Sequence, residues 1–457
     1  MNERKRISVF RRPVKPERVL ALGFLLVIVL GALVLTLPAS GAEGQSIGFF
    51  SALFTATSAV CVTGLTLIDP GPDLSAFGEA VLLMLIQVGG LGFMTFGTLF
   101  MVALGRRVSL RGRVLLRDSM NQTSLSGMVR LSLRFMAIAA AIETTGALLL
   151  MPRLISLYGA GKGVWYSFFT SISAFCNAGF DLFGSGNSVT HLYREPWILL
   201  VASMLIILGG LGFTVLSEVG SSRFQLKKLS LHAKLVLGMT AGLLMFGTLV
   251  ILLLENGNPS TIGAEMSVFE KLVNSFFQAV TLRTAGFASV DQAQLSDSTK
   301  LLSCLLMFIG ASPASTGGGV KTTTSAVLML LVWSVIRGRE RISAFGREIS
   351  ADTARRCFTI VFIGFAMILF STCMISTLEN GRFELIDILF ETTSAFSTTG
   401  LSSLITAKLG RVSQALLIPL MYLGRVGPLT LAFALISRAE GGRINRVHYP
   451  EEKIMIG

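Results

Sequence analysis

The sequence predicts an all-α polytopic membrane protein built from four similar repeats. Three observations support this fold class. The chain has 457 residues, of which 52% are hydrophobic and only 14% charged, and its mean hydropathy is +0.70. Such a chain cannot hide its apolar residues in one water-soluble core, so the bilayer must be its solvent. Its apolar runs suffice for about eight crossings, and one short glycine-ended motif occurs four times.

The apolar runs predict about eight spanning helices, because each crossing needs about 20 residues. The runs lie at about 19–37, 78–104, 129–151, 195–219, 231–254, 299–336, 355–378 and 412–436. The first run follows a basic leader and ends in Pro38-Ala39-Ser40, which resembles the cleavage region of a signal peptide. Its apolar stretch is long for a removable segment, so we expect it to stay as the first membrane helix.

Basic residues gather in alternate loops. Arg106 to Arg117 follow the second run, Arg223 to Lys228 the fourth and Arg337 to Arg347 the sixth. The positive-inside rule therefore puts these loops and both termini in the cytoplasm. Because the net charge of +13 is divided among loops and forms no single patch, we expect no nucleic-acid partner.

Catalytic and metal-binding patterns do not emerge from the sequence. The five cysteines and three histidines are dispersed, which is typical of neither a disulfide framework nor a metal cluster. Glu143, Glu218, Glu391 and His232 are too far apart in sequence to suggest a site. The chain is therefore not expected to be an enzyme.

A short motif recurs between the members of each pair of long runs. It reads FTATSAVCVTGL from Phe54, FTSISAFCNAGF from Phe169, FFQAVTLRTAGF from Phe276 and FETTSAFSTTGL from Phe390. Each repeat of about 110 residues thus holds a spanning helix, a pore half-helix, a glycine turn and a second spanning helix. Non-helical backbone survives at membrane depth only where protein buries it or where it lines a cavity. A glycine can also simply cap a helix, but four at one offset favour a shared cavity.

We therefore expect four membrane-pore-membrane repeats around one central pore. The predicted segments are a cytosolic N-terminal leader 1–18, pore repeats 19–104, 129–220, 231–337 and 355–437, and a cytosolic C-terminal tail 438–457.

The residues at the four turns suit a dehydrated monovalent cation. They are Cys61, Val62, Thr63 and Gly64, then Cys176, Asn177, Ala178 and Gly179, then Arg283, Thr284, Ala285 and Gly286, and finally Ser397, Thr398, Thr399 and Gly400. None is a carboxylate, which disfavours a divalent-selective acidic ring, and backbone carbonyls bind a monovalent ion weakly enough to release it. Glycine at positive φ lets successive carbonyls turn toward one axis, and the half-helices direct their partly negative C-termini there. Arg283 differs from the other turn residues because it carries a charge. We expect its guanidinium to point away from the cation path, to an acidic or carbonyl partner behind the turns.

The sixth run is interrupted by Gly310-Ala311-Ser312-Pro313-Ala314-Ser315-Thr316-Gly317-Gly318-Gly319, so it cannot remain a straight helix. At equivalent points the second and fourth runs carry GGLGF, and the eighth carries Gly424-Arg425-Val426-Gly427-Pro428. The following GGGVKTTT differs from a phosphate-binding loop, because Val320 separates the last glycine from Lys321 and the context is a membrane span.

Taken together, these features resemble the Trk/Ktr/HKT potassium-transporter superfamily over nearly the whole chain. The resemblance rests on the four turns, the interruption, Arg425 and the closing YPEEKIMIG. The chain is most similar to the Ktr-type membrane subunit, since it starts directly at the first repeat. The resemblance implies a potassium-conducting subunit, with or without a dependence on sodium, whose four filter glycines match the potassium-selective pattern.

The resemblance also implies a gate and partners. The gate loop would comprise Ser312, Pro313, Ala314, Ser315, Thr316, Gly317, Gly318 and Gly319, acting with Lys321 and Arg425. Ala314 and Ser315 are a small departure from the family pattern, because these positions usually hold small residues and often glycine. The expected assembly is a homodimer in the lipid of a bacterial inner (plasma) membrane, seated on a cytosolic ring of nucleotide-binding regulatory subunits. No cofactor is expected in this chain, nucleotide being expected only on that partner, which would contact the loops around Arg106 to Arg117 and Arg337 to Arg347.

A secondary transporter is the competing interpretation, because such proteins also use broken helices at the midplane. They usually contain two-fold repeats, whereas this chain has four of like orientation. Moving one charge down the membrane potential yields about 2.3 kcal/mol per 100 mV, or roughly fifty-fold accumulation. Uptake therefore needs no ATPase in this chain, and whether sodium is co-transported or only activating is left open.

Overall fold

The computed structural model describes residues 16–92, 128–184, 188–223, 225–263, 265–339 and 341–427. Most of the leader, the basic loop Arg106 to Arg117, the ends of the second and eighth runs and the C-terminal tail lie outside the described residues. Within the described part the chain is mostly helical, which confirms the all-α fold class. One hairpin pairs β1 (Ile342–Ala344) antiparallel with β2 (Arg347–Ile349).

Four long helices form the first span of each repeat. They are α1 (Pro16–Thr36), α7 (Met128–Tyr158), α11 (Leu231–Glu255) and α15 (Ala351–Leu378). Among the described residues, these four are the unbroken helices that are long and apolar enough to cross a membrane. Their outer faces expose large apolar side chains, such as Met245 on α11 and Phe362 on α15, which suits contact with lipid.

Four shorter helices follow the long ones and are too short to cross. They are α2 (Phe49–Cys61), α8 (Ala160–Phe175), α12 (Val268–Thr281) and α16 (Leu385–Ser397). Their C-terminal halves are buried on all sides. Ser267 and Glu270 form a capping box at the start of α12, which satisfies amide groups that the first helical turn leaves without partners.

The second span of each repeat is shortened, bent or broken within the described residues. These spans are α4 (Ala76–Leu91), α9 (Pro196–Leu211) with α10 (Phe213–Ser221), α13 (Asp297–Phe308) with α14 (Thr322–Ile336), and α17 (Arg411–Val426). The run expected at 195–219 is not one straight helix, because α9 and α10 meet at 96°. The cause is Gly212, whose φ of 88° and ψ of 141° are not helical and would be strained in any residue with a Cβ.

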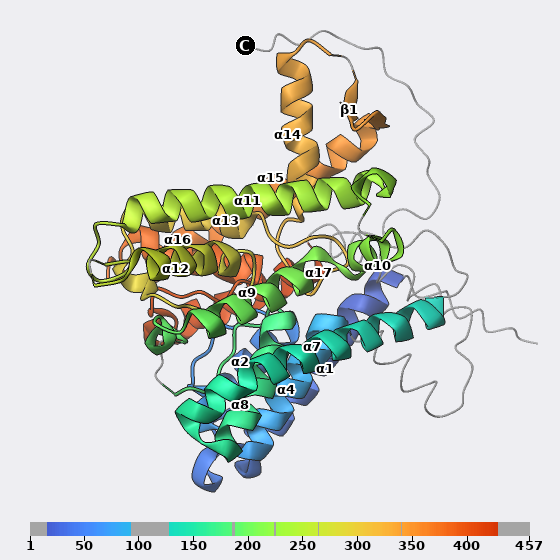
Figure 1. Cartoon of the computed structure of the whole chain (residues 1–457). Helices are drawn as coiled ribbons and strands as arrows, with labels where there is room; N and C mark the ends of the chain where they lie inside the picture. Colours follow the sequence, from blue (N-terminus) through green and yellow to red (C-terminus); the bar gives the residue numbers. More distant parts are fainter. Residues whose placement is uncertain are drawn as a thin grey trace, which may run out of the picture.

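Short helices join these elements. They are η1 (Pro38–Ser40), η2 (Ala42–Gly44), α3 (Pro70–Asp73), η3 (Thr190–Leu192), η4 (Leu226–Lys228), η5 (Gln292–Gln294) and η6 (Thr406–Lys408). The first two repeats gather α1, α2, α4, α7 and α8 on one side of the molecule, with α11, α12, α13 and α16 on the other (Figure 1). Helix α14 and the hairpin project away from the layer that holds α11.

Close helix contacts bring the first spans against the half-helices. A Cβ on Gly146 of α7 would lie 2.6 Å from the hydroxyl of Ser171 on α8, and one on Gly364 of α15 would lie 2.8 Å from the ring of Phe396 on α16. Absence of a side chain at these two positions lets the backbones approach, as is common between membrane helices. The half-helices are thereby held toward the centre of the molecule.

Candidate ion pathway

The four glycine turns meet in one closed ring, although they are far apart in sequence. Each glycine lies against the carbonyl oxygen that precedes the glycine of the next repeat, and the fourth closes on the first. A Cβ on the glycine would lie 2.6 Å from Ala178 O at Gly64, 2.8 Å from Ala285 O at Gly179, 2.4 Å from Thr399 O at Gly286 and 1.9 Å from Thr63 O at Gly400. The repeats therefore surround one axis.

All four turns share an uncommon backbone conformation. The residue two positions before each glycine has a positive φ, which is rare without glycine: 57° at Val62, 58° at Asn177, 70° at Thr284 and 51° at Thr398. The glycines are also at positive φ, between 69° and 98°. This alternation reverses successive peptide planes, so it can direct several carbonyls of one segment to the same side.

The third turn differs in its hydrogen bonding. In the other repeats the amide before the glycine reaches back five residues, as in Thr63 N to Ser58 O at 2.7 Å and Thr399 N to Ser394 O at 2.9 Å. In the third repeat Ala285 N donates to Thr281 O, four residues back, at 3.0 Å. The ring is thus four-fold in outline but not in detail.

Partial negative charge converges on this ring. The half-helices end at Cys61, Phe175, Thr281 and Ser397, so the unpaired carbonyls of their last turns lie beside the four turns. Several hydroxyl groups there are buried and have no hydrogen-bond partner among the described residues, including those of Thr63, Thr284, Thr398 and Thr399. Such a collection of uncharged oxygens fits a monovalent cation and has no fixed charge to trap it.

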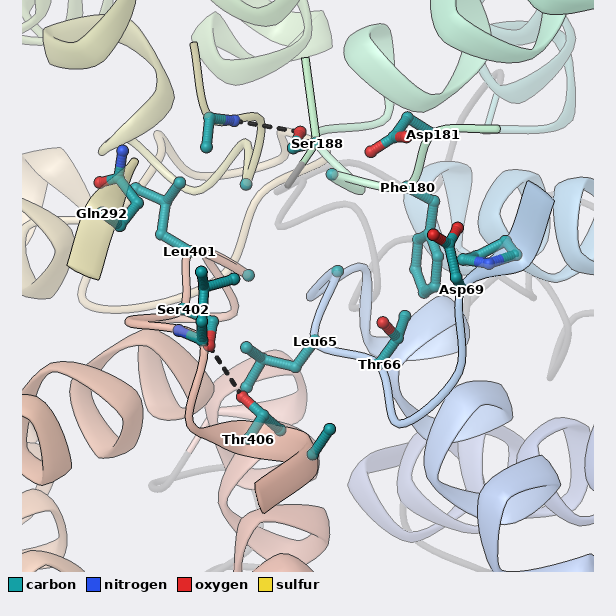
Figure 2. A pocket seen from close by; sticks show the side chains of 18 of the residues that line it. Leu65, Thr66, Asp69, Phe180, Asp181, Ser188, Gln292, Leu401, Ser402 and Thr406 are labelled. Carbon is teal, nitrogen blue, oxygen red and sulfur yellow. Dashed lines mark hydrogen bonds between the residues drawn. The ribbon is translucent and has the colours of Figure 1, made fainter. Parts of the chain in front are cut away.

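A cavity of about 340 Å³ opens on one side of the ring (Figure 2). All four glycines line it, together with residues that follow them in each repeat. Four aspartates also line it, namely Asp69, Asp73, Asp181 and Asp291, and none of the described lining residues is a lysine or arginine. We call this cavity the vestibule. These aspartates form no motif in the sequence, since they come from three different connecting segments.

One of the vestibule aspartates has a shifted pKa. Burial raises the pKa of Asp181 to about 6. The hydrogen bond from Phe183 N lowers this pKa, and the nearby Asp69 carboxylate raises it. Phe183 N donates to Asp181 Oδ1 at 3.2 Å. Asp181 is therefore charged at neutral pH and loses its charge in mildly acidic solution.

The interruption of the sixth run lies against the opposite side of the ring. Helix α13 ends at Phe308 and α14 begins at Thr322, and the segment between them contacts the residues that precede the ring glycines. A Cβ on Gly317 would lie 2.1 Å from the hydroxyl of Thr284, and one on Gly318 would lie 2.2 Å from that of Thr398. Ser312, Thr316, Gly317 and Gly318 are buried, whereas Pro313, Ala314, Ser315 and Gly319 are partly buried. We call residues 309–321 the loop.

The bend between α9 and α10 supplies hydrogen-bond partners for the loop. Ser312 N donates to Gly210 O at 3.0 Å, and Phe213 N donates to Ala314 O at 3.0 Å. Within the loop, Gly310 N donates to Val320 O at 2.8 Å. A non-helical segment at membrane depth needs such partners for its amides and carbonyls. The non-helical geometry at Gly212 leaves backbone groups of the fourth run free to bind the loop.

Two basic side chains reach the loop. Arg425 of α17 donates to Thr316 O and to the carbonyls of Gly89 and Gly90, the last at 3.2 Å. Lys321 donates from Nζ to Gly317 O at 2.7 Å. Both positive charges therefore lie on the side of the ring that the loop contacts.

Arg283 was expected to meet an acidic or carbonyl partner, and the described residues provide no acidic one. Its side chain is buried, and its Nε and Nη2 have no hydrogen-bond partner among the described residues. The ion pairs of the described part also leave it out. It is absent from the vestibule lining, so the guanidinium does not face that cavity.

Two buried glutamates that seemed isolated in the sequence belong to the surroundings of the ring. Gln87 Nε2 donates to both carboxylate oxygens of Glu143, at 3.0 and 2.8 Å, and Cys176 Sγ donates to Gln87 Oε1 at 3.2 Å. Glu391 accepts bonds from the segment after Gly400. A glutamate inside a buried half-helix was the available signal, but its partners could not be known before the chain folded.

Known proteins resemble this chain over nearly its whole length. Residues 19–446 match the family TrkH, described as cation transport protein. The chain is 37% identical to the potassium/sodium uptake protein NtpJ of Enterococcus hirae, with 98% of each chain covered. It is 38% identical to the Ktr system potassium uptake protein B of Bacillus subtilis, with 97% of each covered.

Among solved structures, the potassium transporter TrkH from Vibrio parahaemolyticus has a similar fold. The TM-score is 0.73 at 17% sequence identity, and the match covers 96% of this chain and 87% of that one. These similarities confirm the resemblance inferred from the sequence, and the family is one of transporters, not of enzymes. With its four turns, its ring and its match over residues 19–446, this chain belongs to the TrkH family of cation transport proteins.

Proposed function

We propose that this chain is the ion-translocating subunit of a potassium uptake system. The single observation that carries the proposal is the cyclic contact of the four turns, in which each glycine abuts the carbonyl of the next repeat. Closed rings of backbone carbonyls can replace the hydration shell of a potassium ion. The relatives named as potassium uptake proteins, at 37 to 38% identity, support the same substrate.

In this proposal the four turns, from Cys61, Cys176, Arg283 and Ser397 to their glycines, form the selectivity filter. Potassium ions enter through the vestibule, where the aspartates raise the local concentration of cations. They then exchange water for backbone and threonine oxygens at the ring. The side chain of Arg283 takes no part in binding the ion, because a guanidinium in the path would repel it.

The loop is the gate in this proposal. Its glycines lie against Thr284 and Thr398, so in this conformation it blocks the path beneath the filter. Lys321 and Arg425 add positive charge at the same place, which opposes a cation electrostatically as well. Opening therefore requires the loop to move and the Arg425 bonds to break.

We further propose the assembly that the family resemblance implies. The chain would form a homodimer with one pore per subunit in a bacterial inner membrane, with both termini cytoplasmic and residues 19–104, 129–220, 231–337 and 355–437 as its four pore repeats. A separate nucleotide-binding subunit would control the gate from the cytosol. The exposed arginines Arg341 and Arg347 on the hairpin are surfaces available to it, and recovery of no soluble subunit on co-purification from native membranes would contradict this part.

Sodium is the second candidate ion. The name of the Enterococcus relative includes both potassium and sodium, so sodium could be transported together with potassium or could only activate its uptake. The ring of uncharged oxygens is compatible with either role.

Tracer flux in proteoliposomes tests the proposal. The purified full-length chain is reconstituted, a potential negative inside is imposed, and potassium uptake is measured with and without sodium. We expect potassium uptake that exceeds sodium uptake at equal concentrations. Equal uptake of the two ions, or none above empty vesicles even when Ala314 to Gly317 of the loop are deleted, would contradict the proposed function, and sodium entering in fixed ratio to potassium would assign co-transport.

A further inference from the structure

Glu391 is a buried carboxylate beside the filter that the proposed ion path does not use. It lies on α16, one residue after Phe390, and its side chain is fully buried. Within the described part of the chain, no lysine or arginine forms an ion pair with it. A carboxylate buried in this way persists only where hydrogen bonds replace its water.

Three donors from one short segment supply those bonds. Ser402 Oγ and Ser403 N donate to Glu391 Oε1, the second at 3.0 Å, and Thr406 Oγ1 donates to Oε2 at 2.7 Å. Ser402 and Thr406 also contact each other at 3.1 Å, as the dashed line between them in Figure 2 shows. The oxygens of a carboxyl group accept hydrogen bonds, and all three partners can donate them.

The segment that Glu391 holds is both strained and adjacent to the ring. Leu404 has a φ of 60°, a conformation that a branched side chain rarely adopts. Leu404 N donates to Ser402 Oγ at 2.9 Å, so the hydroxyl that binds the carboxylate also stabilises this turn. Ser402 and Thr406 line the vestibule, and Gly400, two residues earlier, is the glycine packed most closely on its neighbour, the carbonyl of Thr63.

The other repeats hold their turns differently. The positions that correspond to Glu391 are Thr55 and Thr170 in the first two repeats and Phe277 in the third. The third repeat instead uses a buried amide pair, in which Gln278 and Gln292 exchange two hydrogen bonds of 2.6 and 3.1 Å. Among the described residues, only the fourth repeat has a half-helix carboxyl group that binds the segment after its glycine.

We infer that Glu391 is a positioning residue for ion selectivity, which holds residues 401–406 and thereby fixes the Gly400 turn against the carbonyl of Thr63. The inference rests on the proposed function. A smaller sodium ion is bound well only if the ring contracts around it, and a segment fixed by three bonds to one carboxylate resists that movement. Without the carboxylate, the ring can adapt to sodium and the preference for potassium falls.

Competitive uptake measures this effect. Full-length Glu391→Ala, Glu391→Gln and Ser402→Ala proteins are reconstituted, and the ratio of potassium to sodium uptake is compared with that of the unsubstituted chain. We expect the ratio to fall about tenfold in Glu391→Ala, the equivalent of one hydrogen bond. It should fall less in Glu391→Gln, which keeps one accepting oxygen, and in Ser402→Ala, which removes one donor.

Glu379→Gln is the matched control. Glu379 is also a buried carboxylate that accepts from a backbone amide and a hydroxyl, Gly410 N at 2.7 Å and Ser413 Oγ at 2.6 Å, but neither partner lines the vestibule. Its loss should lower thermal stability and leave the uptake ratio unchanged, so a merely structural role is separated from positioning.

The outcomes divide clearly. If Glu391→Ala does not fold, Glu391→Gln and Ser402→Ala decide, and ratios equal to that of the unsubstituted chain in both would overturn the inference. A fall of the same size in Glu379→Gln would overturn it as well, because any loss of stability would then produce the effect. If the unsubstituted chain showed no preference for potassium, the proposed function and the inference would fall together, whereas a selective chain with unaffected variants would refute the inference alone.

Discussion

The guanidinium of Arg425 donates a hydrogen bond to the backbone carbonyl of Thr316, which joins the last described helix to the centre of the loop. The same side chain binds the carbonyls of Gly89 and Gly90 in the first repeat. One residue of the fourth repeat therefore ties the loop of the third repeat to the second span of the first. Arginine suits this role because its five donors can serve several carbonyls at once.

Breaking this connection should open the path. Deletion of Ala314 to Gly317 should raise potassium flux markedly without abolishing selectivity, because the four turns remain. Arg425→Ala should raise flux by a smaller amount, since the loop keeps its bonds to Gly210 and Phe213. Arg411→Ala, at the exposed start of the same helix, is the control and should have no effect. A folded, membrane-inserted deletion variant whose flux was unchanged or lower would make the interruption a structural kink.

Substitution of a ring glycine should impair selectivity. Gly64→Ser places a Cβ 2.6 Å from Ala178 O at a φ of 98°, so the carbonyl must move and the turn must change. We expect the ratio of potassium to sodium permeability to fall about tenfold or more, a shift of about 1.4 kcal/mol. Gly159→Ala is a matched control, because Gly159 also has a positive φ, of 81°, but has open space around it. Unchanged relative permeability in Gly64→Ser would remove Gly64 from the filter.

Acidic solution on the vestibule side of the membrane should slow potassium uptake, because it protonates Asp181. Burial raises its pKa from 3.8 to about 6, so the vestibule loses a negative charge as the pH falls through that value. We expect uptake at limiting potassium to fall about twofold between about pH 7 and pH 5, the effect of one charge at roughly 10 Å in water. Asp181→Asn should remove this dependence in tracer uptake at varied external pH.

Protonation of Asp181 would not lower uptake by unfolding the protein. Because the folded pKa of Asp181 lies above its ordinary value, the folded state binds the proton more tightly than the unfolded state does. Protonation of Asp181 below about pH 6 therefore adds to stability. An equal loss of uptake in Asp181→Asn would assign the titration to another group.

Stability should depend on the ion pair between α13 and α16. Lys300 Nζ lies 2.8 Å from Asp387 Oδ1, and the two side chains are 6% and 18% exposed. Removing one partner from a buried pair leaves the other charge without compensation, which costs about 3–5 kcal/mol. Since Asp387 keeps some exposure, we expect Lys300→Ala to lower the free energy of unfolding by about 3 kcal/mol, at the lower end of that range.

Thermal unfolding in detergent measures the loss. Arg341→Ala is the control, because its pair with Glu348 has side chains that are 77% and 55% exposed and surface pairs contribute about 0–1 kcal/mol. If the unfolding midpoint of Lys300→Ala changed as little as that of Arg341→Ala, the contact between α13 and α16 would not need the charge pair.

Much of the fold could be predicted from the sequence because local patterns determine it. Apolar runs predicted the long helices α1, α7, α11 and α15, and the recurring motif predicted four half-helices that end near a glycine. Proline with many glycines predicted that no helix could continue through residues 310–319. GGLGF marked the equivalent point of the fourth run, but the bend of 96° at Gly212 could not be predicted from it, because the motif is compatible with a straight helix until another segment needs its backbone groups.

Contacts between repeats were decided only by the tertiary structure. The sequence by itself determined how many turns there are, which residues form them and that none carries a carboxylate. The sequence does not reveal that Gly400 closes on Thr63, that Glu391 binds Ser402 and Thr406, or that Arg283 lacks an acidic partner within the described part of the chain. Periodicity and turn chemistry act over a few neighbouring residues, whereas these pairings join groups that meet only when four separately encoded repeats pack around one axis.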